Sequence, residues 1–220
     1  MASSIYIICL GLGFLMNYKA GLIVALLIIF SHLYNATFKN KGILGSIVLP
    51  LGIATMSIFG AVAVSGKIPQ IVWYGFVGVF LFDFGAHIAT TFKDIDHDRS
   101  AGIVTTPIQI GVKPALFLST LATISAFVVF ALPYALGKVE PHYLIWAGIA
   151  FGATFMTRIP LLFKQTQDNG YLALKGSLLS CIVLYPCLIS IVLPLYISAI
   201  IILTPFLLSI ILLELATQKV

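Results

Sequence analysis

Long apolar segments alternate with short polar connections along the whole chain, and each segment ends at a charge, a glycine or a proline. A helix that crosses a bilayer needs about 20 predominantly apolar residues, and most of the segments approach this length, although the first is shorter. The pattern therefore predicts an all-α fold, a polytopic transmembrane helix bundle with about seven to eight spans. The predicted segments are Ser3–Leu15, Ala20–Thr37, Gly42–Val64, Ile68–Thr90, Pro114–Leu136, His142–Phe163, Tyr171–Val192 and Tyr196–Ala216.

Composition supports an integral membrane protein. The mean hydropathy is +1.12, hydrophobic residues make up 60% of the chain and charged residues only 9%. No soluble domain of this size buries so much apolar surface, so we expect residues 1–220 to form a single transmembrane domain in the lipid bilayer. We expect cytoplasmic loops at about 38–42 and 91–113. The net charge of +5 reflects scarce acids and does not indicate a nucleic-acid partner.

The distribution of basic residues predicts the orientation, because cytoplasmic loops of membrane proteins carry an excess of Lys and Arg. If the connections after the second, fourth and sixth segments face the cytoplasm, nine of the twelve basic residues lie on that side. These nine are Lys39, Lys41, Lys93, Arg99, Lys113, Arg158, Lys164, Lys175 and Lys219. We therefore predict a multi-pass protein whose acidic loop and both termini are cytoplasmic.

Acidic residues are concentrated in one stretch. Four of the seven carboxylates fall within sixteen residues, namely Asp83, Asp94, Asp96 and Asp98. Asp94 and Asp98 are four residues apart and would share one face of a helix, where two like charges repel unless a cation lies between them. Mg²⁺ takes oxygen ligands and shares them with phosphates, and the flanking Lys93 and Arg99 suit a bound anion. The alternative is a solvated loop whose charges keep it out of the bilayer.

Two further groups of polar residues adjoin this stretch. Asp83 and His87 stand four residues apart inside an apolar segment, where ionisable groups are costly and often functional. They either join neighbouring helices as a satisfied pair or extend the acidic site into the membrane. Tyr34 closes the second segment just before Lys39 and Lys41. This basic loop is either a topology signal or a second contact for a metal-bound polyphosphate.

Three stretches resemble the UbiA superfamily of intramembrane prenyltransferases. The run 33–46 is similar to the tyrosine–lysine loop of that family. The run 94–107, which contains Asp94, Asp98, Gly102 and a Thr-Thr-Pro ending, resembles its second Asp-rich motif, and Ile110-Gly111 opens the next span in the same way. The resemblance covers roughly residues 20–115.

The resemblance implies a helical bundle around a cavity open to the membrane, in which Mg²⁺ bridges the diphosphate of an isoprenyl donor. The chain would then be an Mg²⁺-dependent prenyltransferase that moves an isoprenyl group from a polyprenyl diphosphate to a lipophilic aromatic or hydroxyl acceptor. By this resemblance Asp94 and Asp98 are catalytic and hold the metal, with Asp96 as a further ligand candidate. Contacts to the diphosphate are expected from Tyr34, Lys39, Lys93 and Arg99, with Asp83 and His87 supporting the site.

The chain also departs from the family pattern. The first Asp-rich motif of the family has no counterpart, since no acidic residue precedes Asp83. The segments match the family from its third helix onward, so we expect the first two helices of the family to be missing. Three explanations are open: a fragment or misplaced start codon, a degenerate protein, or a split site completed by a second chain.

Other functions are therefore weighed beside the enzyme. A catalytically incomplete subunit or scaffold with the same fold is the non-enzymatic alternative. A CDP-alcohol phosphotransferase would need an upstream Asp-Gly-x-x-Ala-Arg run, which Gly85-Ala86-His87 does not supply. A transporter is less favoured, because intramembrane charges are few and no internal repeat is visible.

Overall fold

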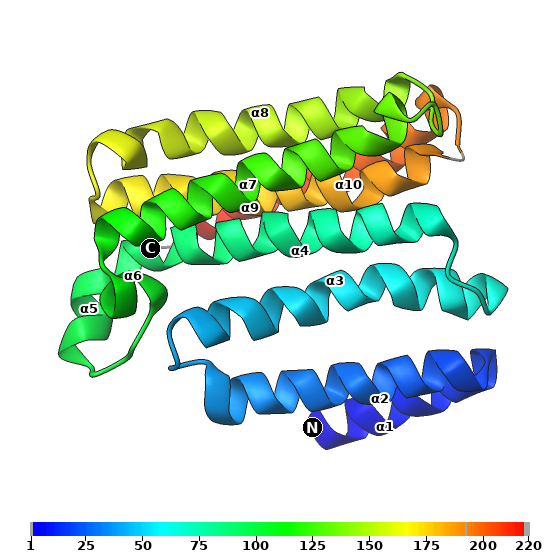
Figure 1. The fold of residues 1–220 in the computed structure, drawn as a ribbon, viewed down its shortest axis with the longest axis horizontal. Helices are drawn as coiled ribbons and strands as arrows, with labels where there is room; N and C mark the ends of the chain where they lie inside the picture. Colours follow the sequence, from blue (N-terminus) through cyan, green and yellow to red (C-terminus); the bar gives the residue numbers. More distant parts are fainter. Residues whose placement is uncertain (1, 192, 218–220) are drawn as a thin grey trace. The chain divides into compact units, whose positions relative to one another are not determined.

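A computed structural model describes residues 2–191 and 193–217, and every regular element within them is a helix (Figure 1). This confirms the predicted all-α class. The chain divides into two compact units, one running up to Val129 and the other starting at Phe130, and each is described by itself. The expectation of a single transmembrane domain stays a prediction.

The first unit contains four helices that follow one another along the chain, then a group of short helices, and then most of a fifth long helix. The four are α1 (Ala2–Met16), α2 (Tyr18–Leu33) with its π-helical extension η1 (Tyr34–Phe38), α3 (Ile43–Ser65) and α4 (Gln70–Thr90). The short helices are η2 (Thr91–Asp94), α5 (Ile95–Ser100) and α6 (Thr106–Ile110), and the long helix is α7 (Val112–Ala135). The predicted loop 91–113 is therefore mostly helical.

The second unit contains the end of α7 and three further long helices. These are α8 (His142–Phe163), α9 (Gln167–Cys187) with the 3-10 turn η3 (Leu188–Ile191), and α10 (Leu195–Thr217). Across the described residues, seven helices are long and apolar enough to cross a membrane, and Ser4–Met16 forms a shorter apolar helix. This agrees with the predicted spans, including the short first segment. Val192, the predicted end of the seventh segment, and Lys219 lie outside the described residues.

Side-chain hydrogen bonds fix where the helices of the first unit begin and end. Asn17 precedes α2 and accepts a hydrogen bond from the Ala20 N–H at 2.9 Å, while its amide donates to the Val62 carbonyl at 2.9 Å. One side chain therefore caps the start of α2 and the end of α3. α3 ends at Ser65, and the next residue, Gly66, has a left-handed backbone with φ of 66°, which is typical of a glycine that terminates a helix.

Close packing at Gly85 holds α4 against the first part of α7. The Ser119 hydroxyl donates to the Gly85 carbonyl at 2.6 Å, and a Cβ at position 85 would lie 2.6 Å from the Thr123 Oγ1. Membrane helices commonly approach each other through small residues of this kind. The contact fixes the helix that carries Asp83 and His87 and leads into the acidic segment.

The second unit is joined by the same means. Gly176 of α9 packs closely against Thr157 of α8. A Cβ added at position 176 would lie 1.8 Å from the Thr157 hydroxyl oxygen. Arg158 is only 4% exposed and donates to the Ser177 hydroxyl at 3.2 Å. Trp146 donates to the Ser198 hydroxyl at 3.3 Å, which attaches α10 to α8. These polar contacts supplement an otherwise apolar interior.

Candidate functional site

The acidic segment continues directly from α4. The chain leaves α4 at Thr90, turns once through η2 and enters α5, so that Asp94 stands at the α5 start and Asp98 one turn later. Both carboxylates are half-buried and lie close enough for their charges to repel each other. Asp96, two residues from each, is exposed and does not share their face, since positions two apart on a helix point in different directions. The structure therefore pairs Asp94 with Asp98 and separates Asp96 from them.

The two basic residues beside these carboxylates differ in their surroundings. Lys93 is half-buried and forms an ion pair with Asp94. Arg99 lies on α5 and is exposed. Lys93 thus balances part of the acidic charge, while Arg99 presents its guanidinium at the surface of the short helix.

A glycine lets the acidic helix end sharply. Gly102 has a φ of 71°, in the left-handed region, and its N–H donates to the Arg99 carbonyl at 3.3 Å. The next residue, Ile103, donates its N–H to the Asp98 carbonyl at 2.8 Å. The chain therefore turns back immediately after α5, as the trailing glycine of the motif suggests.

Tyr34 begins the π-helical turn η1, and Lys39 follows it directly. The Lys39 N–H donates to the Tyr34 carbonyl at 2.8 Å, five residues earlier, which widens the helix at the end of α2. Turns of this type occur frequently at functional sites. The Tyr34 ring meets the His87 ring edge-on, with 6.4 Å between the ring centres and 73° between the planes. Lys39 is exposed, and the structure thus joins Tyr34 to α4 and leaves the lysine at the surface.

Asp83 and His87 lie one turn apart on α4, and both are half-buried. They belong to the same helix that leads into Asp94, and the contact between His87 and Tyr34 connects this helix to the end of α2. Both residues therefore lie on the helix that leads into the acidic segment, and their support of the site stays a prediction.

The start of α3 is bonded to the segment that follows α5. The Gly42 N–H donates to the Val104 carbonyl at 2.8 Å, and the Ile43 N–H donates to the Gln109 Oε1 at 2.8 Å. The Ser46 and Thr106 hydroxyls share a buried hydrogen bond of 2.8 Å. These bonds connect the end of the lysine-bearing turn to the end of the acidic segment. Sequence reasoning missed Gln109, which carries no motif signal beyond being a polar residue between two isoleucines.

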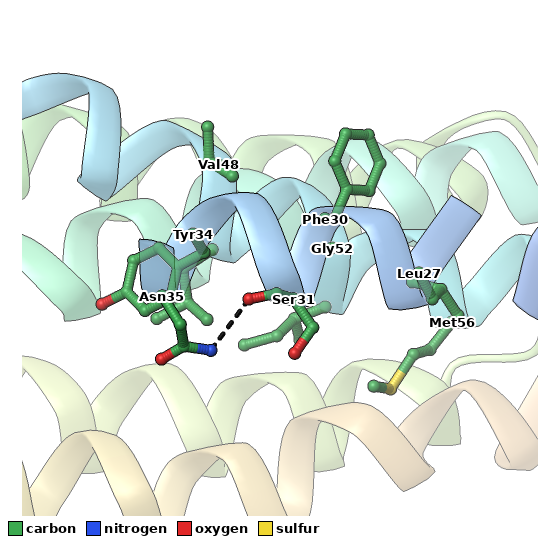
Figure 2. A pocket seen from close by; sticks show the side chains of 10 residues that line it. Leu27, Phe30, Ser31, Tyr34, Asn35, Val48, Gly52 and Met56 are labelled. Atoms are coloured by element: carbon green, nitrogen blue, oxygen red, sulfur yellow. Dashed lines mark hydrogen bonds between the residues drawn. The ribbon is translucent and has the colours of Figure 1, made fainter. Parts of the chain in front are cut away.

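A pocket of about 280 Å³ lies between α2 and α3 beside Tyr34 (Figure 2). Figure 2 shows Tyr34 and Asn35 at one end and Leu27 and Met56 at the other, and the Asn35 amide donates to the Ser31 carbonyl at 2.8 Å. The remaining lining residues are Phe30, Val48, Leu49, Gly52 and Ile53. The pocket therefore offers a polar end at the π-turn and apolar walls along the two helices.

The donor set fits a magnesium ion that is shared with a phosphate ligand. Among the described residues, no group of three or more His, Cys, Asp and Glu side chains is arranged to hold a metal by itself. Mg²⁺ is often bound by only one or two carboxylates, with waters and substrate phosphates completing its shell. The Asp94–Asp98 pair, with mutually repelling carboxylates, meets that requirement.

The sequence is similar to those of known proteins. The family model for the UbiA prenyltransferase family matches residues 1–180. The digeranylgeranylglyceryl phosphate synthase of Methanocaldococcus jannaschii is 26% identical over 141 residues, which cover 64% of this chain and 48% of that protein. The synthase of Hyperthermus butylicus is 30% identical over 123 residues, covering 53% of this chain and 40% of the relative. The chain thus spans about half the length of these relatives.

A solved structure described as that of a digeranylgeranylglyceryl phosphate synthase in membranes shares the fold. Its TM-score is 0.71 at 24% identity, and the match covers 86% of this chain and 67% of that one. Together with the seven apolar helices, the similarity describes an integral, multi-pass membrane protein. Because the family model covers most of its length, from residue 1 to residue 180, the chain belongs to the UbiA prenyltransferase family.

Proposed function

We propose that the chain transfers an isoprenyl group from a polyprenyl diphosphate to a lipophilic acceptor in an Mg²⁺-dependent reaction. The observation that carries the proposal is the Asp94–Asp98 pair, held one turn apart where α4 leads into α5. The basic residues around it, and the pocket that begins at Tyr34, supply the two other features that a phosphate-bearing lipid requires. Membership of the UbiA prenyltransferase family supports the same class of reaction.

In this proposal Asp94 and Asp98 hold the metal, and the exposed Asp96 does not. A bound Mg²⁺ would supply positive charge against the developing diphosphate. Lys39 and Arg99, both exposed, approach the diphosphate as donors, with Tyr34 adding its hydroxyl. Lys93 pairs with Asp94 and directs that carboxylate, while Asp83 and His87 position the site from inside the apolar unit.

The pocket between α2 and α3 suits part of the apolar chain of a substrate. Its walls are aliphatic or aromatic except at the Tyr34 end, which is also the end that contacts His87 of α4. A diphosphate at the acidic segment and an isoprenoid chain along α2 and α3 would place polar and apolar parts of one molecule against matching surfaces. An apolar enclosure also protects an allylic cation from water.

The reaction would break the bond between the allylic carbon and the diphosphate oxygen, and the diphosphate would leave with the electron pair. A new bond would form from the allylic carbon to an aromatic carbon or a hydroxyl oxygen of the acceptor, whose proton would pass to the departing diphosphate. The related proteins are named for a glyceryl phosphate product, which favours a hydroxyl acceptor. We therefore propose a prenylated glyceryl phosphate as the first acceptor to be tried.

The test uses the purified full chain with a polyprenyl diphosphate and a prenylated glyceryl phosphate as acceptor, with and without Mg²⁺, and measures donor binding and the release of diphosphate. We expect Mg²⁺-dependent release that falls by at least about 100-fold in Asp94→Ala and in Asp98→Ala, because several kcal/mol of charge stabilisation are lost. Asp96→Ala is the matched control, since its carboxylate is exposed and turned away from the pair, and its release should stay within about threefold of wild type.

The other outcomes separate the alternatives. Binding without release would favour an incomplete site that needs further helices or a second chain, and would reject an enzyme that works alone. Neither binding nor release would reject the prenyltransferase proposal for this chain and leave the subunit or scaffold alternative. Equal losses in all three aspartate variants would remove the assignment of the metal to Asp94 and Asp98.

A further inference from the structure

The start of α3 lacks a cap from its own sequence. The residue at the cap position is Gly42, which has no side chain to accept from the first N–H groups of the helix and takes a φ of 57°. Helix starts leave four N–H groups without partners inside the helix, and these need acceptors from elsewhere. Leu44 donates locally to the Lys41 carbonyl at 3.2 Å, whereas the acceptor for Ile43 comes from a segment more than sixty residues further along the chain.

Gln109 fills the role of the missing cap. Its Oε1 accepts the Ile43 N–H at 2.8 Å, and a Cβ built on Gly42 would lie 2.0 Å from the same oxygen. The glutamine can therefore reach the helix only because position 42 is glycine. Glycine here meets two requirements, a left-handed backbone and the close approach of a side chain.

The bonds beside Gln109 connect the two charged segments of the site. Gly42, three residues after Lys39, donates to the carbonyl of Val104 at 2.8 Å. Ile103, which precedes Val104, donates to the carbonyl of Asp98 at 2.8 Å. Backbone hydrogen bonds thus connect the lysine-bearing turn to the acidic helix, and the Gln109 side chain adds a further bond to the residue after Gly42.

We infer that Gln109 is a positioning residue, which holds the turn carrying Lys39 in register with Asp94 and Asp98 so that both segments contact one diphosphate. This inference rests on the proposed function. Gln109 itself touches no substrate atom in this scheme. It acts through Lys39, because loss of its acceptor frees the α3 start and the turn before it.

The experiment compares Gln109→Met, which keeps the length of the side chain but removes the acceptor, with Gln109→Glu, which keeps an oxygen in place. We expect Gln109→Met to raise the KM for the polyprenyl diphosphate about tenfold and to change kcat much less. A net loss of one hydrogen bond costs about 1 kcal/mol, which corresponds to a change in affinity of roughly this size. Gln109→Glu should recover most of the affinity. Gln165→Met is the matched control, because Gln165 bonds the end of α8 through its amide and should leave the KM unchanged.

A double-mutant cycle with Lys39→Ala separates positioning from a general loss of stability. If Gln109 acts through Lys39, the Gln109→Met effect on KM should fall below about twofold once the lysine is absent. Amide exchange at Gly42 and Ile43 should become faster in Gln109→Met and remain unchanged in Gln165→Met. These two amides report the bonded segment directly, without any need for catalysis.

Two results would overturn the inference while the proposed function stands, namely an active wild type whose KM is unaffected by Gln109→Met, or equal effects of that change with and without Lys39. A wild-type chain that neither binds nor cleaves the donor would instead reject the proposed function, and the positioning role with it. The wild-type measurement therefore distinguishes the two failures.

Discussion

Tyr34 has two separate surroundings, since its ring packs edge-on against His87 and its side chain lines the polar end of the pocket between α2 and α3. The ring contact connects η1 to α4, so removal of the ring would alter the unit as well as the site. Removal of the hydroxyl alone leaves the ring contact in place. The two roles are therefore separable by substitution.

We predict that Tyr34→Phe raises the KM for the diphosphate donor by about three- to tenfold, the value of one lost hydrogen bond, while the thermal unfolding temperature stays the same. Tyr34→Ala should raise the KM further and also lower the unfolding temperature, because the contact with His87 is lost. Steady-state kinetics and unfolding in detergent measure both quantities. A Tyr34→Phe protein with wild-type kinetics would remove the hydroxyl from the list of diphosphate contacts.

The wall of the pocket between α2 and α3 contains one position without a side chain. Gly52 lies in the middle of the lining, and a Cβ added there would meet only the Phe30 Cβ, at 3.9 Å. A small side chain therefore fits without strain, whereas a larger one must extend into the pocket. This allows the space to be filled without moving the helices apart.

We predict that Gly52→Leu reduces turnover of a long polyprenyl diphosphate by about tenfold or more, as an extra side chain in a chain-binding pocket excludes several methylenes of the ligand. A short donor should be affected much less. Gly60→Leu is the control on the same helix, because Gly60 is exposed and has nothing within 4 Å of an added Cβ. Equal kinetics for Gly52→Leu and Gly60→Leu with every donor would place the isoprenoid chain elsewhere.

At the scale of the whole molecule, the long helices were predictable and the short ones were not. Segments such as His142–Phe163 read directly as helices, because twenty or more apolar residues in lipid leave the backbone no other way to satisfy its hydrogen bonds. The segment 91–113 was expected as a loop but forms η2, α5, α6 and the start of α7. η2, α5 and α6 have only four to six residues, too few for an apolar pattern of their own to predict them.

The same division applies to the candidate site. The pairing of Asp94 with Asp98 follows from a spacing of four residues, which any helical conformation converts into proximity. The contact of Tyr34 with His87 and the bond from Ile43 to Gln109 join positions far apart in the sequence, so no local sequence pattern predicts them. Ordinary residues such as Gln109 acquire a role only through the fold.

The distribution of charge predicts the orientation of the first unit in the membrane, and this prediction can be tested across a single span. Asn40 lies before α3 and Lys67 after it, both exposed, so a helix of 23 residues separates them. The side of Asn40 carries Lys39, Lys41, Lys93, Arg99 and Lys113, while the opposite side of this unit carries Lys19 and Lys67. The excess of positive charge predicts that the Asn40 side and the acidic segment face the cytoplasm.

Single cysteines at these positions, in a chain whose Cys9, Cys181 and Cys187 are replaced by alanine, would report the orientation through a membrane-impermeant maleimide. We expect Lys67→Cys to react in intact cells and Asn40→Cys only after the membrane is opened. Ser100→Cys, on the exposed end of α5, should behave like Asn40→Cys, because both segments are bonded together through Gly42 and Val104. The reverse labelling pattern would show that the orientation is the opposite of the predicted one. If Ser100→Cys reacted like Lys67→Cys, the acidic segment and the Lys39 turn would lie on opposite sides of the membrane. Lys39 and Asp98 could not then contact one diphosphate.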